Sequence, residues 1–514
     1  MLIGGSGFLG RQMSATLRDR YDVHVLARRT ERAVGFTPHR DVHWTQVDIG
    51  DRPWLAHAFE KLRDLPRPLH VVHLAAHYDF TGKNHPEYQR TNIDGLRNVL
   101  ELCKELRPDS FVFASSLAAC AFPPPGKALN EESPPDGDHI YAATKRIGEG
   151  MVREYQQHFP TVIVRMAALF SDWCEYPPLY FFLRTWLSNA WNRNVLGGHG
   201  DSAIPYLHVR CAVRFYERIL EALPALSPSE VVICSPDGSI SHRDTFEAAT
   251  ASWFGRALHA FGTAKVVARI GLWVMEQTGR FRAEPPFERS WMGRYIDLRL
   301  ETDGHRTREK IGWSPNPRLF LLRRIPFLLE NLRSDPLGWH ARNLAAIDSM
   351  RVEPNLALYH LLHEHDEEMI RISTARFLDP KDGVLLHHYQ EMDPEELHWA
   401  KRQLFLQFRN AIRTDDRTVF RSYCRELAAR RHAHDFTEGE VCAAMELERQ
   451  VVLSTLRADP RTTKLIRDVN ERVVSTFAAG IDEIQDVFEE LDGFHPEGVS
   501  DGQSIWPANQ PKAP

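Results

Sequence analysis

The first third of the chain alternates short apolar runs with stretches of helical spacing. The apolar runs, rich in branched aliphatic side chains, cover residues 1–3, 21–27, 42–48, 70–76 and 110–116. Buried strands separated by helices are typical of a parallel sheet that carries helices on both faces. The pattern therefore predicts an α/β fold with a doubly wound parallel sheet. The first run is shorter than the roughly five or six residues of an average strand, so the sequence leaves open whether the chain begins further upstream.

Beyond about residue 335 the strand pattern ends and a helical pattern begins. Apolar positions recur every three or four residues through 356–378, 394–414, 417–432, 438–458 and 462–491. This periodicity predicts an all-α helical bundle after the sheet domain. The expected divisions are an α/β domain at 1–335 with its substrate part mainly at 166–330, a helical linker at 336–392, a bundle at 393–492 and a disordered tail at 493–514. The tail is expected because it is rich in Gly, Pro and polar residues.

Charge divides the chain in a similar way. The 514 residues carry 63 Lys and Arg against 69 Asp and Glu, a net charge of −6. Residues 337–514 hold 21 basic and 31 acidic side chains, a net of −10, which leaves +4 on residues 1–336. A general nucleic-acid-binding protein needs a strongly basic surface, so no nucleic-acid partner is expected. The difference between front and back indicates two units with different roles.

The sequence predicts a cytoplasmic protein with no membrane span, no disulfide framework and no metal site. Its seven cysteines are scattered and contain no Cys-x-x-Cys pair, which favours a reducing compartment. The most apolar stretch, Val266 to Met275, is interrupted by Arg269 and is shorter than the roughly 18 residues of a membrane helix. No secretory signal precedes the first strand. The histidines and acids from His360 to Glu368 have the spacing of a solvated helix rather than of metal ligands.

A glycine-rich turn links the first strand to the first helix. Gly4, Gly7 and Gly10 stand in the run Gly-Gly-Ser-Gly-Phe-Leu-Gly. Glycines allow a pyrophosphate to approach backbone N–H groups and the N-terminus of the following helix. The pattern lies between a strand and a helix, as the dinucleotide-binding motif requires. It predicts dinucleotide binding, with a plain tight turn as the alternative.

The residues after the second strand indicate which dinucleotide is bound. An Asp or Glu about 20 residues past the glycines usually holds the ribose 2′-hydroxyl of NAD, whereas the 2′-phosphate of NADP favours arginine. Here Arg28 and Arg29 follow the strand, and no acid stands at its end. NADP(H) is therefore the expected cofactor and NAD the alternative, while a solvated charged loop would also account for the two arginines.

A tyrosine and a lysine stand four residues apart at the head of a predicted helix. Tyr141 and Lys145 share one helix face, and an ammonium group beside a phenol is expected to lower the phenol pKa. Ser116 ends the preceding strand, where its hydroxyl could polarise a substrate carbonyl. A Tyr-x-x-x-Lys pair alone is common on protein surfaces, but its combination with the strand-end serine and the glycine loop favours proton-transfer chemistry.

These pieces occur in the order of a known family. The matching segments are Gly4 to Gly10, Val47-Asp48, His73 to Ala76, Asn92-x-x-Gly95, Ala114 to Ser116, Tyr141-x-x-x-Lys145, Val164-Arg165, Tyr206 to Val209 and Ile311 to Trp313. Residues 1 to about 330 resemble the extended short-chain dehydrogenase/reductase superfamily, in the branch of the NAD-dependent epimerase/dehydratases. The resemblance implies a Rossmann-type sheet and an enzyme that uses a nicotinamide cofactor.

The resemblance also implies roles for individual positions. Ser116, Tyr141 and Lys145 would form the catalytic triad, with Tyr141 as acid/base and Lys145 also holding the nicotinamide ribose. The positions implied for cofactor binding are Gly4, Gly7, Phe8, Leu9, Gly10, Arg28, Arg29, Asp48, Ile49, Leu74, Ala75, Ala76, Asn92, Ser115, Tyr141 and Lys145. Within this set the family places Asp48 at the adenine and Ala75 beside the cofactor.

The substrate half departs from the sugar-nucleotide enzymes of the family. Ala119-Cys120-Ala121 stands where many of them have Val-Tyr-Gly, and Arg210-Cys211 follows His208-Val209 where an Asp pair is common. An aromatic series begins the same half: Trp173, Tyr176, Tyr180, Phe181, Phe182, Trp186 and Trp191. Such a series is more often core than pocket; if it lines a pocket, a lipophilic or aromatic substrate fits better than a sugar diphosphate.

Three functions follow from these observations. The leading interpretation is an NAD(P)-dependent oxidoreductase that transfers hydride to or from a carbonyl or carbinol carbon of a small-molecule substrate. An epimerase or dehydratase with transient oxidation of a sugar-type substrate uses the same triad and is the first alternative. The second is a non-catalytic NADP(H) sensor that signals through the helical bundle.

The back of the chain carries a second, looser resemblance. The run from Phe420 to Arg431, followed by Phe436 to Leu447, resembles the helical N-terminal sensor domain of RsbR-type stress-signalling regulators, over roughly residues 395–490. A generic bundle is the alternative. The resemblance implies a regulatory or dimerising role, hence a homodimer and a signalling partner for the C-terminal helices.

Overall fold

The computed structural model describes residues 1–279, 287–348, 354–378 and 386–492. The chain folds as two compact units, Met1–Arg351 and Val352–Pro514. The tail predicted to be disordered, residues 493–514, lies outside the described residues. Within the described ranges, no helix combines the length and the apolarity that crossing a membrane requires.

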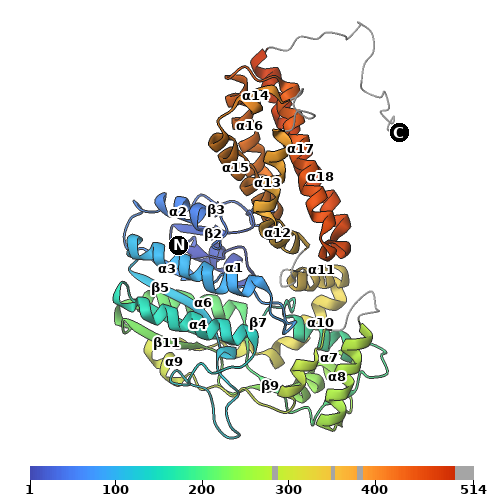
Figure 1. The fold of residues 1–514 in the computed structure, drawn as a ribbon. Helices are drawn as coiled ribbons and strands as arrows, with labels where there is room; N and C mark the ends of the chain where they lie inside the picture. Colours follow the sequence, from blue (N-terminus) through green and yellow to red (C-terminus); the bar gives the residue numbers. More distant parts are fainter. Residues whose placement is uncertain (280–286, 349–353, 379–385, 493–514) are drawn as a thin grey trace, which may run out of the picture. The chain divides into compact units, whose positions relative to one another are not determined.

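A seven-stranded parallel sheet organises the first unit (Figure 1). Its strands are β1 (Leu2–Ile3), β2 (Val23–Ala27), β3 (Val42–Gln46), β4 (His70–His73), β5 (Ser110–Ser116), β6 (Thr161–Met166) and β11 (Ser229–Cys234). Their spatial order is β11-β6-β5-β4-β1-β2-β3, so the chain builds the sheet outward in both directions from β1. Every neighbouring pair is parallel. The predicted doubly wound α/β fold is confirmed.

Helices cover both faces of this sheet. One face carries α1 (Phe8–Leu17) and α6 (Val209–Ala222), and the other carries α2 (Arg52–Glu60), α3 (Leu96–Leu106) and α4 (Ile140–Glu154). Met13 and Val25 belong to the core on the first face, whereas Leu26 and Phe113 belong to the core on the second. Because side chains alternate between faces along a strand, neighbours such as Val25 and Leu26 supply opposite cores.

The rest of the first unit departs from the main sheet after β6. Short strands pair there in two-stranded sheets: β7 (Ala168–Phe170), β8 (Val195–Gly197), β9 (Ala203–Ile204), β10 (Tyr206–His208), β12 (Ile240–Ser241) and β13 (Phe261–Thr263). The helices are α5 (Pro177–Trp186), α7 (His242–Phe254), α8 (Lys265–Gly279), α9 (His305–Ile311), α10 (Leu321–Ser334) and α11 (Pro336–Asp348).

Helix α11 packs into the first unit, although the sequence placed the end of that domain at residue 335. Trp339 is 1% exposed in the core that it shares with α5 and α10. Asn343 Nδ2 donates to the carbonyl of Trp173, and Asn343 Oδ1 accepts from the backbone N–H of Glu175, both at 2.8 Å. The helical pattern continues past residue 335, so periodicity alone does not mark where the first unit ends.

Two elements at the carboxyl ends of the sheet strands differ from the sequence prediction. Strand β4 ends at His73 rather than at Ala76, because its neighbour β1 ends at Ile3 and Leu74 N–H makes the last bond between them, 2.8 Å to the carbonyl of Ile3. Helix α3 is preceded by a π-helical segment at Tyr88–Gly95 that continues into it and that the sequence pattern did not indicate. Wide π turns inside helices occur often at functional sites.

The second unit is all-helical, as predicted. Its helices are α12 (Pro354–Glu364), α13 (Asp366–Phe377), α14 (His387–Glu391), α15 (Pro394–Thr414), α16 (Thr418–His432), α17 (Glu438–Ala458) and α18 (Ile466–Asp492). The single helix expected over 356–378 is broken at His365, whose ring contacts Glu368 and Asp459. A Cβ at Gly480 would lie 2.7 Å from Phe420 and 2.8 Å from Cys424, so this glycine lets α18 approach α16.

Candidate active site

A cavity of about 1590 Å³ opens at the carboxyl ends of the sheet strands. Its wall runs from the glycine loop, past the ends of β2, β4 and β5, to the helices of the substrate part. Ligands of open parallel sheets bind at this edge. Pockets for one small molecule usually measure about 300–1,000 Å³, so this cavity has room for a dinucleotide and a substrate together.

The glycine loop brings the chain close to the end of β4. Gly4 has a φ of +86°, and a Cβ there would lie 2.6 Å from the backbone nitrogen of Ala75. A Cβ at Gly10 would lie 2.6 Å from Cα of Gly5, so α1 can cross the loop closely only with glycine at this position. Gly7 caps α1, whose first residues Phe8 and Leu9 face the cavity. The loop therefore presents backbone N–H groups and a helix N-terminus to any phosphate bound there.

Two arginines follow β2 at the same end of the cavity. Arg29 donates from Nη2 to the carbonyl of Ser6 in the glycine loop at 3.0 Å. Arg28 Nη1 lies 4.0 Å from the Glu87 carboxylate. The backbone carbonyls of both arginines accept bonds from β3, from Gln46 and Trp44. These bonds from β3 side chains hold the backbone of the two arginines at the edge of the sheet. Both arginines line the cavity.

The next loops complete this end of the cavity. Asp48 and Ile49 follow β3, and Leu74, Ala75 and Ala76 follow β4; all five line the cavity. The Asp48 carboxylate accepts from the backbone N–H of Gly50 at 2.8 Å. This bond orients the Asp48 side chain just after the end of β3, where the family resemblance places the adenine.

Ser116, Tyr141 and Lys145 come together at the end of β5 and the start of α4. The hydroxyls of Ser116 and Tyr141 are hydrogen-bonded to each other. Lys145 donates from Nζ to the carbonyl of Ala114 at 2.6 Å, and its Nζ lies 5.7 Å from the centre of the Tyr141 ring. Tyr78 stacks on that ring, with centroids 4.3 Å apart. The phenol is thus held in one orientation with its hydroxyl beside the serine.

Burial governs the titration of both groups. It raises the pKa of Tyr141, and the bond from Ser116 offsets only part of that effect. Burial lowers the pKa of Lys145 to about 8, opposed by the charge of Glu149. The sequence predicted a lowered phenol pKa; burial raises it instead, and the effect that opposes this shift comes from Ser116. A phenol that keeps its proton is suited to donate it to a substrate oxygen.

A buried ion pair braces the helix that carries Tyr141 and Lys145. Glu149, one turn after Lys145 on α4, accepts two bonds from Arg165 on β6 at 2.8 and 3.0 Å. It also accepts from the Ser115 hydroxyl at 2.7 Å. Ser115, predicted to contact the cofactor, therefore directs its hydroxyl to Glu149. Sequence reasoning missed Glu149, because its partner lies 16 residues further along, on another strand.

Asn92 lies in the π-helical segment and hydrogen-bonds to two other parts of the site. Its Oδ1 accepts from the backbone N–H of His77 at 2.6 Å, and its Nδ2 donates to Thr144 Oγ1 and to the carbonyl of His77, both at 3.0 Å. Thr144 in turn donates to the carbonyl of Tyr141 at 2.8 Å. Asn92 therefore ties the loop after β4 to the head of α4. Asn92, Gly10 and Lys145 are the predicted cofactor residues that do not themselves line the cavity.

The far end of the cavity is rich in aromatic side chains. Tyr176, Phe182, Trp186 and Trp191 line it, whereas Tyr180 packs against Trp339 in the core. The aromatic series thus divides between pocket and core. Further wall residues that sequence reasoning did not single out are Leu272 and Met275 of α8, Phe287, Glu288, Trp291 and Arg342.

The charges in the described cavity wall are unevenly placed. Its Lys and Arg side chains are Arg11, Arg28 and Arg29 at the glycine-loop end and Arg342 at the far end. The Arg342 guanidinium lies 4.5 Å from the centre of the Trp173 ring. Burial raises the pKa of the Glu288 carboxyl, as expected where an acid lies in apolar surroundings.

Comparisons with known proteins agree with this geometry. The model of the NAD dependent epimerase/dehydratase family matches residues 1–234. The chain is 29% identical over 221 residues to UDP-glucuronate 4-epimerase 1 of Arabidopsis thaliana, covering 38% of this chain and 47% of that protein. It is 26% identical over 148 residues to a putative dihydroflavonol 4-reductase of Synechocystis sp., covering 28% of this chain and 40% of that protein. The chain thus spans about half the length, or less, of these curated relatives.

A solved structure shares the fold. The crystal structure of gox2253 matches with a TM-score of 0.51 and 19% identity, over 66% of this chain and 98% of that one. This likeness concerns the fold alone, whereas the family match is one of sequence over residues 1–234. The model of the NAD dependent epimerase/dehydratase family thus matches residues 1–234, a little under half of this chain.

Proposed function

We propose that the first unit is an NADP(H)-dependent oxidoreductase that acts on a carbonyl or carbinol carbon of a lipophilic small molecule. The observation that carries this proposal is the division of the cavity into a basic end at the glycine loop and an aromatic end at which Arg342 is the only described Lys or Arg. Phosphates suit the first end, and apolar groups suit the second.

The cofactor end fits a dinucleotide. Glycine at position 4 lets the loop lie close to Ala75 and has no side chain that would cover the loop backbone there. Helix α1 begins at the same point. Arg28 and Arg29 supply positive charge where a ribose 2′-phosphate would lie, which favours NADP(H) over NAD. When bound, the nicotinamide supplies or accepts the hydride.

The protein's own residues would handle the proton. Tyr141, kept protonated by burial, donates to the substrate oxygen in the direction of carbonyl reduction. Ser116 bonds to the same phenol and can polarise the oxygen. Lys145 carries a positive charge below pH 8 and stabilises the phenolate that remains after proton transfer.

The substrate class follows from the far end of the cavity. Of the cavity residues that the structure describes there, Arg342 is the only Lys or Arg, and its guanidinium already stacks on Trp173. A sugar diphosphate carries at least two negative charges that need several cations or N–H groups. The aromatic and aliphatic wall instead suits a substrate that buries rings or alkyl chains.

Epimerisation is the second candidate, and the relatives' names favour it. The Arabidopsis relative is a UDP-glucuronate 4-epimerase, but the family match ends at residue 234. Helix α8 and the segments from Phe287 to Trp291, which build much of the apolar wall, lie beyond that point. The two reactions differ in stoichiometry, because an epimerase regenerates its cofactor and an oxidoreductase consumes it.

The first experiment is a pair of titrations of the full chain with NADPH and with NADH, followed by nicotinamide fluorescence. Tighter binding of NADPH supports the proposed cofactor, and equal binding or preference for NADH contradicts it. A screen of lipophilic ketones and aldehydes then measures net oxidation of NADPH, with Tyr141→Phe as the control. Conversion of UDP-glucuronate without net cofactor use would establish epimerase chemistry instead.

We infer a regulatory or dimerising role for the second unit, since the described cavity wall ends at Ala346 and takes no residue from that unit. The alternative of a non-catalytic sensor predicts cofactor binding without turnover on any substrate. Light scattering on the full chain and on residues 1–351 tests dimerisation: a full-length dimer and a truncated monomer support the inference, and identical masses contradict it.

A further inference from the structure

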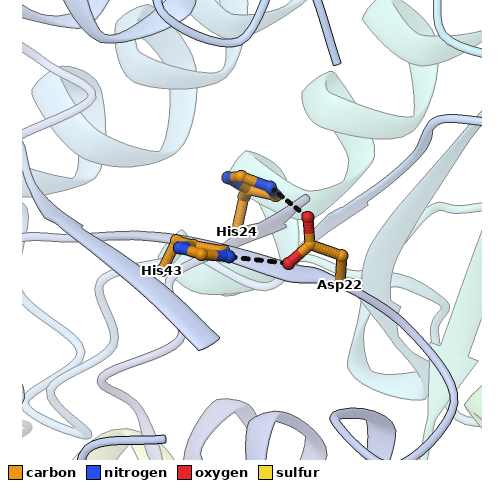
Figure 2. Close-up of side chains that lie close together, drawn as sticks. All are labelled: Asp22, His24 and His43. Atoms are coloured by element: carbon orange, nitrogen blue, oxygen red, sulfur yellow. Dashed lines mark hydrogen bonds and ion pairs between the residues drawn. The ribbon is translucent and has the colours of Figure 1, made fainter. Parts of the chain in front are cut away.

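Three side chains with metal-binding atoms face one another at the opposite end of the sheet from the cavity. His24 Nε2 lies 3.1 Å from Asp22 Oδ2, and His43 Nε2 lies 2.7 Å from Asp22 Oδ1 (Figure 2). The three candidate ligand atoms all lie within 4.8 Å of one another. None of these residues lines the cavity, so this cluster has no part in the chemistry proposed there.

The sheet itself sets this arrangement. His24 on β2 and His43 on β3 are register partners in the parallel ladder. Their rings stack with centroids 4.7 Å apart, close to the spacing of neighbouring strands. Asp22 directly precedes β2, and the carboxylate lies across the edges of both rings, with one oxygen toward each Nε2 (Figure 2). The cluster therefore has a fixed geometry that does not depend on a flexible loop.

The donor set suits a borderline divalent cation. Imidazole nitrogen and carboxylate oxygen bind Zn²⁺ at about 2.0–2.2 Å, which puts neighbouring ligands of a tetrahedral site about 3.4 Å apart. The Asp22 oxygens lie 3.1 and 2.7 Å from the two Nε2 atoms, somewhat closer than that value, so side-chain rotations that widen the cluster would admit the ion. Mg²⁺ and Ca²⁺ prefer all-oxygen ligand sets and are poorly served here.

We propose that Asp22, His24 and His43 form a Zn²⁺ site that clamps β2 to the edge strand β3. The remaining coordination position faces solvent, since Asp22 and His43 are about half exposed, and water or an additional ligand fills it. Upon binding, the carboxylate oxygen and both Nε2 atoms contact the ion, and each neutral imidazole carries its proton on Nδ1. The site stabilises the edge of the sheet and takes no part in hydride or proton transfer.

The test uses the full chain after removal of metals by a chelator. Isothermal titration with ZnCl₂ measures affinity and stoichiometry, and the absorption spectrum of the Co²⁺ form reports nitrogen and oxygen ligands in a tetrahedral field. The variant is His43→Gln, whose amide can still donate to Asp22 but cannot replace the imidazole as a ligand. The matched control is His57→Gln, at an exposed histidine that has a single carboxylate neighbour.

The proposal expects one Zn²⁺ that His43→Gln weakens by at least about tenfold and His57→Gln leaves unchanged. It also expects ZnCl₂ to raise the melting temperature of the parent chain more than that of His43→Gln. Absence of Zn²⁺ binding, or equal binding by the parent chain and His43→Gln, would overturn it. In that case the cluster is a hydrogen-bonded triad only, and Asp22 serves as the acceptor between two imidazoles.

Discussion

Tyr141 shows how a single side chain is prepared by its surroundings. Its ring stacks on Tyr78 and lies near Lys145, its hydroxyl is bonded to Ser116, and burial raises its pKa. Each of these partners comes from a different segment: the loop after β4, the end of β5 and the body of α4. At the residue scale, the groups that surround the phenol therefore determine its orientation and its pKa.

Replacing Tyr141 by Phe removes the proton donor and keeps the ring in place. We expect turnover of a carbonyl substrate to fall by at least about 100-fold, with NADPH binding little changed. Tyr78→Phe is the matched control, because it also deletes one hydroxyl and leaves a stacked ring. Steady-state assays and cofactor titrations on both variants measure the difference, and similar losses in the two variants would contradict the role of Tyr141.

The pKa of Lys145 gives the site a characteristic dependence on pH. Since its pKa is about 8, the ammonium is charged below that value and neutral above it. The charged form stabilises the phenolate left by proton transfer, so we expect kcat/KM for carbonyl reduction to fall as pH rises through about 8. A pH profile of Lys145→Met should be lower throughout and lack this step. A parent profile that is flat from pH 7 to 9 would contradict the assignment.

Arg29 allows the cofactor preference to be tested at one position. A charge-assisted contact with phosphate is worth about 1.5–3 kcal/mol, so Arg29→Ala should weaken NADPH binding by roughly ten- to a hundredfold and affect NADH much less. Arg32→Ala, at an exposed arginine nearby, should change neither. Equal losses for both cofactors would mean that the bond from Arg29 to Ser6 supports the loop, with no contact to a 2′-phosphate.

At the scale of elements, α4 is the support of the site. Glu149 fixes this helix to β6 through Arg165 and to β5 through Ser115. The π-helical segment holds the other side of the helix through Asn92 and Thr144. These contacts join three secondary-structure elements around the first three turns of α4. Small shifts of any one of them would displace Tyr141.

Removing the charge of Glu149 should weaken the whole first unit. Arg165 is 1% exposed, and a buried charge that loses its partner costs about 3–5 kcal/mol. We expect Glu149→Gln to lower the free energy of unfolding by that amount, measured by urea denaturation. Glu154→Gln, at an exposed position of the same helix, should change it by less than about 0.5 kcal/mol. Similar values for the two variants would show that the ion pair contributes little.

At the scale of the whole molecule, the boundary of the first unit decides which part of the chain can bind cofactor. Helix α11 buries Trp339 in this unit and places Arg342 in the cavity wall. We expect residues 1–351 to fold and to bind NADPH like the full chain. Residues 1–335, which lack α11, should be markedly less stable. Circular dichroism melting and NADPH titration of the two fragments test this, and equal stability would contradict the role of α11.

Features that are local in the chain could be predicted from the sequence. The glycine loop, the two arginines, the serine at the strand end and the Tyr-x-x-x-Lys helix all lie within short segments, where the spacing of residues fixes their relative placement. The parallel sheet and the helical nature of the second unit were predicted from periodicity, because apolar spacing reports which face of an element is buried. These inferences depend only on residues that are close to one another in the sequence.

Only the tertiary structure decided which distant residues meet. The pairing of Glu149 with Arg165 depends on how α4 crosses β6, and the division of the aromatic series between cavity and core depends on how α5 packs against α11. The Asp22, His24 and His43 cluster depends on the register of β2 against β3. The direction of the Tyr141 pKa shift depends on burial, which outweighs the hydrogen bond from Ser116. Register, crossing angle and burial are set by packing of the whole unit, so spacing along the chain does not contain them.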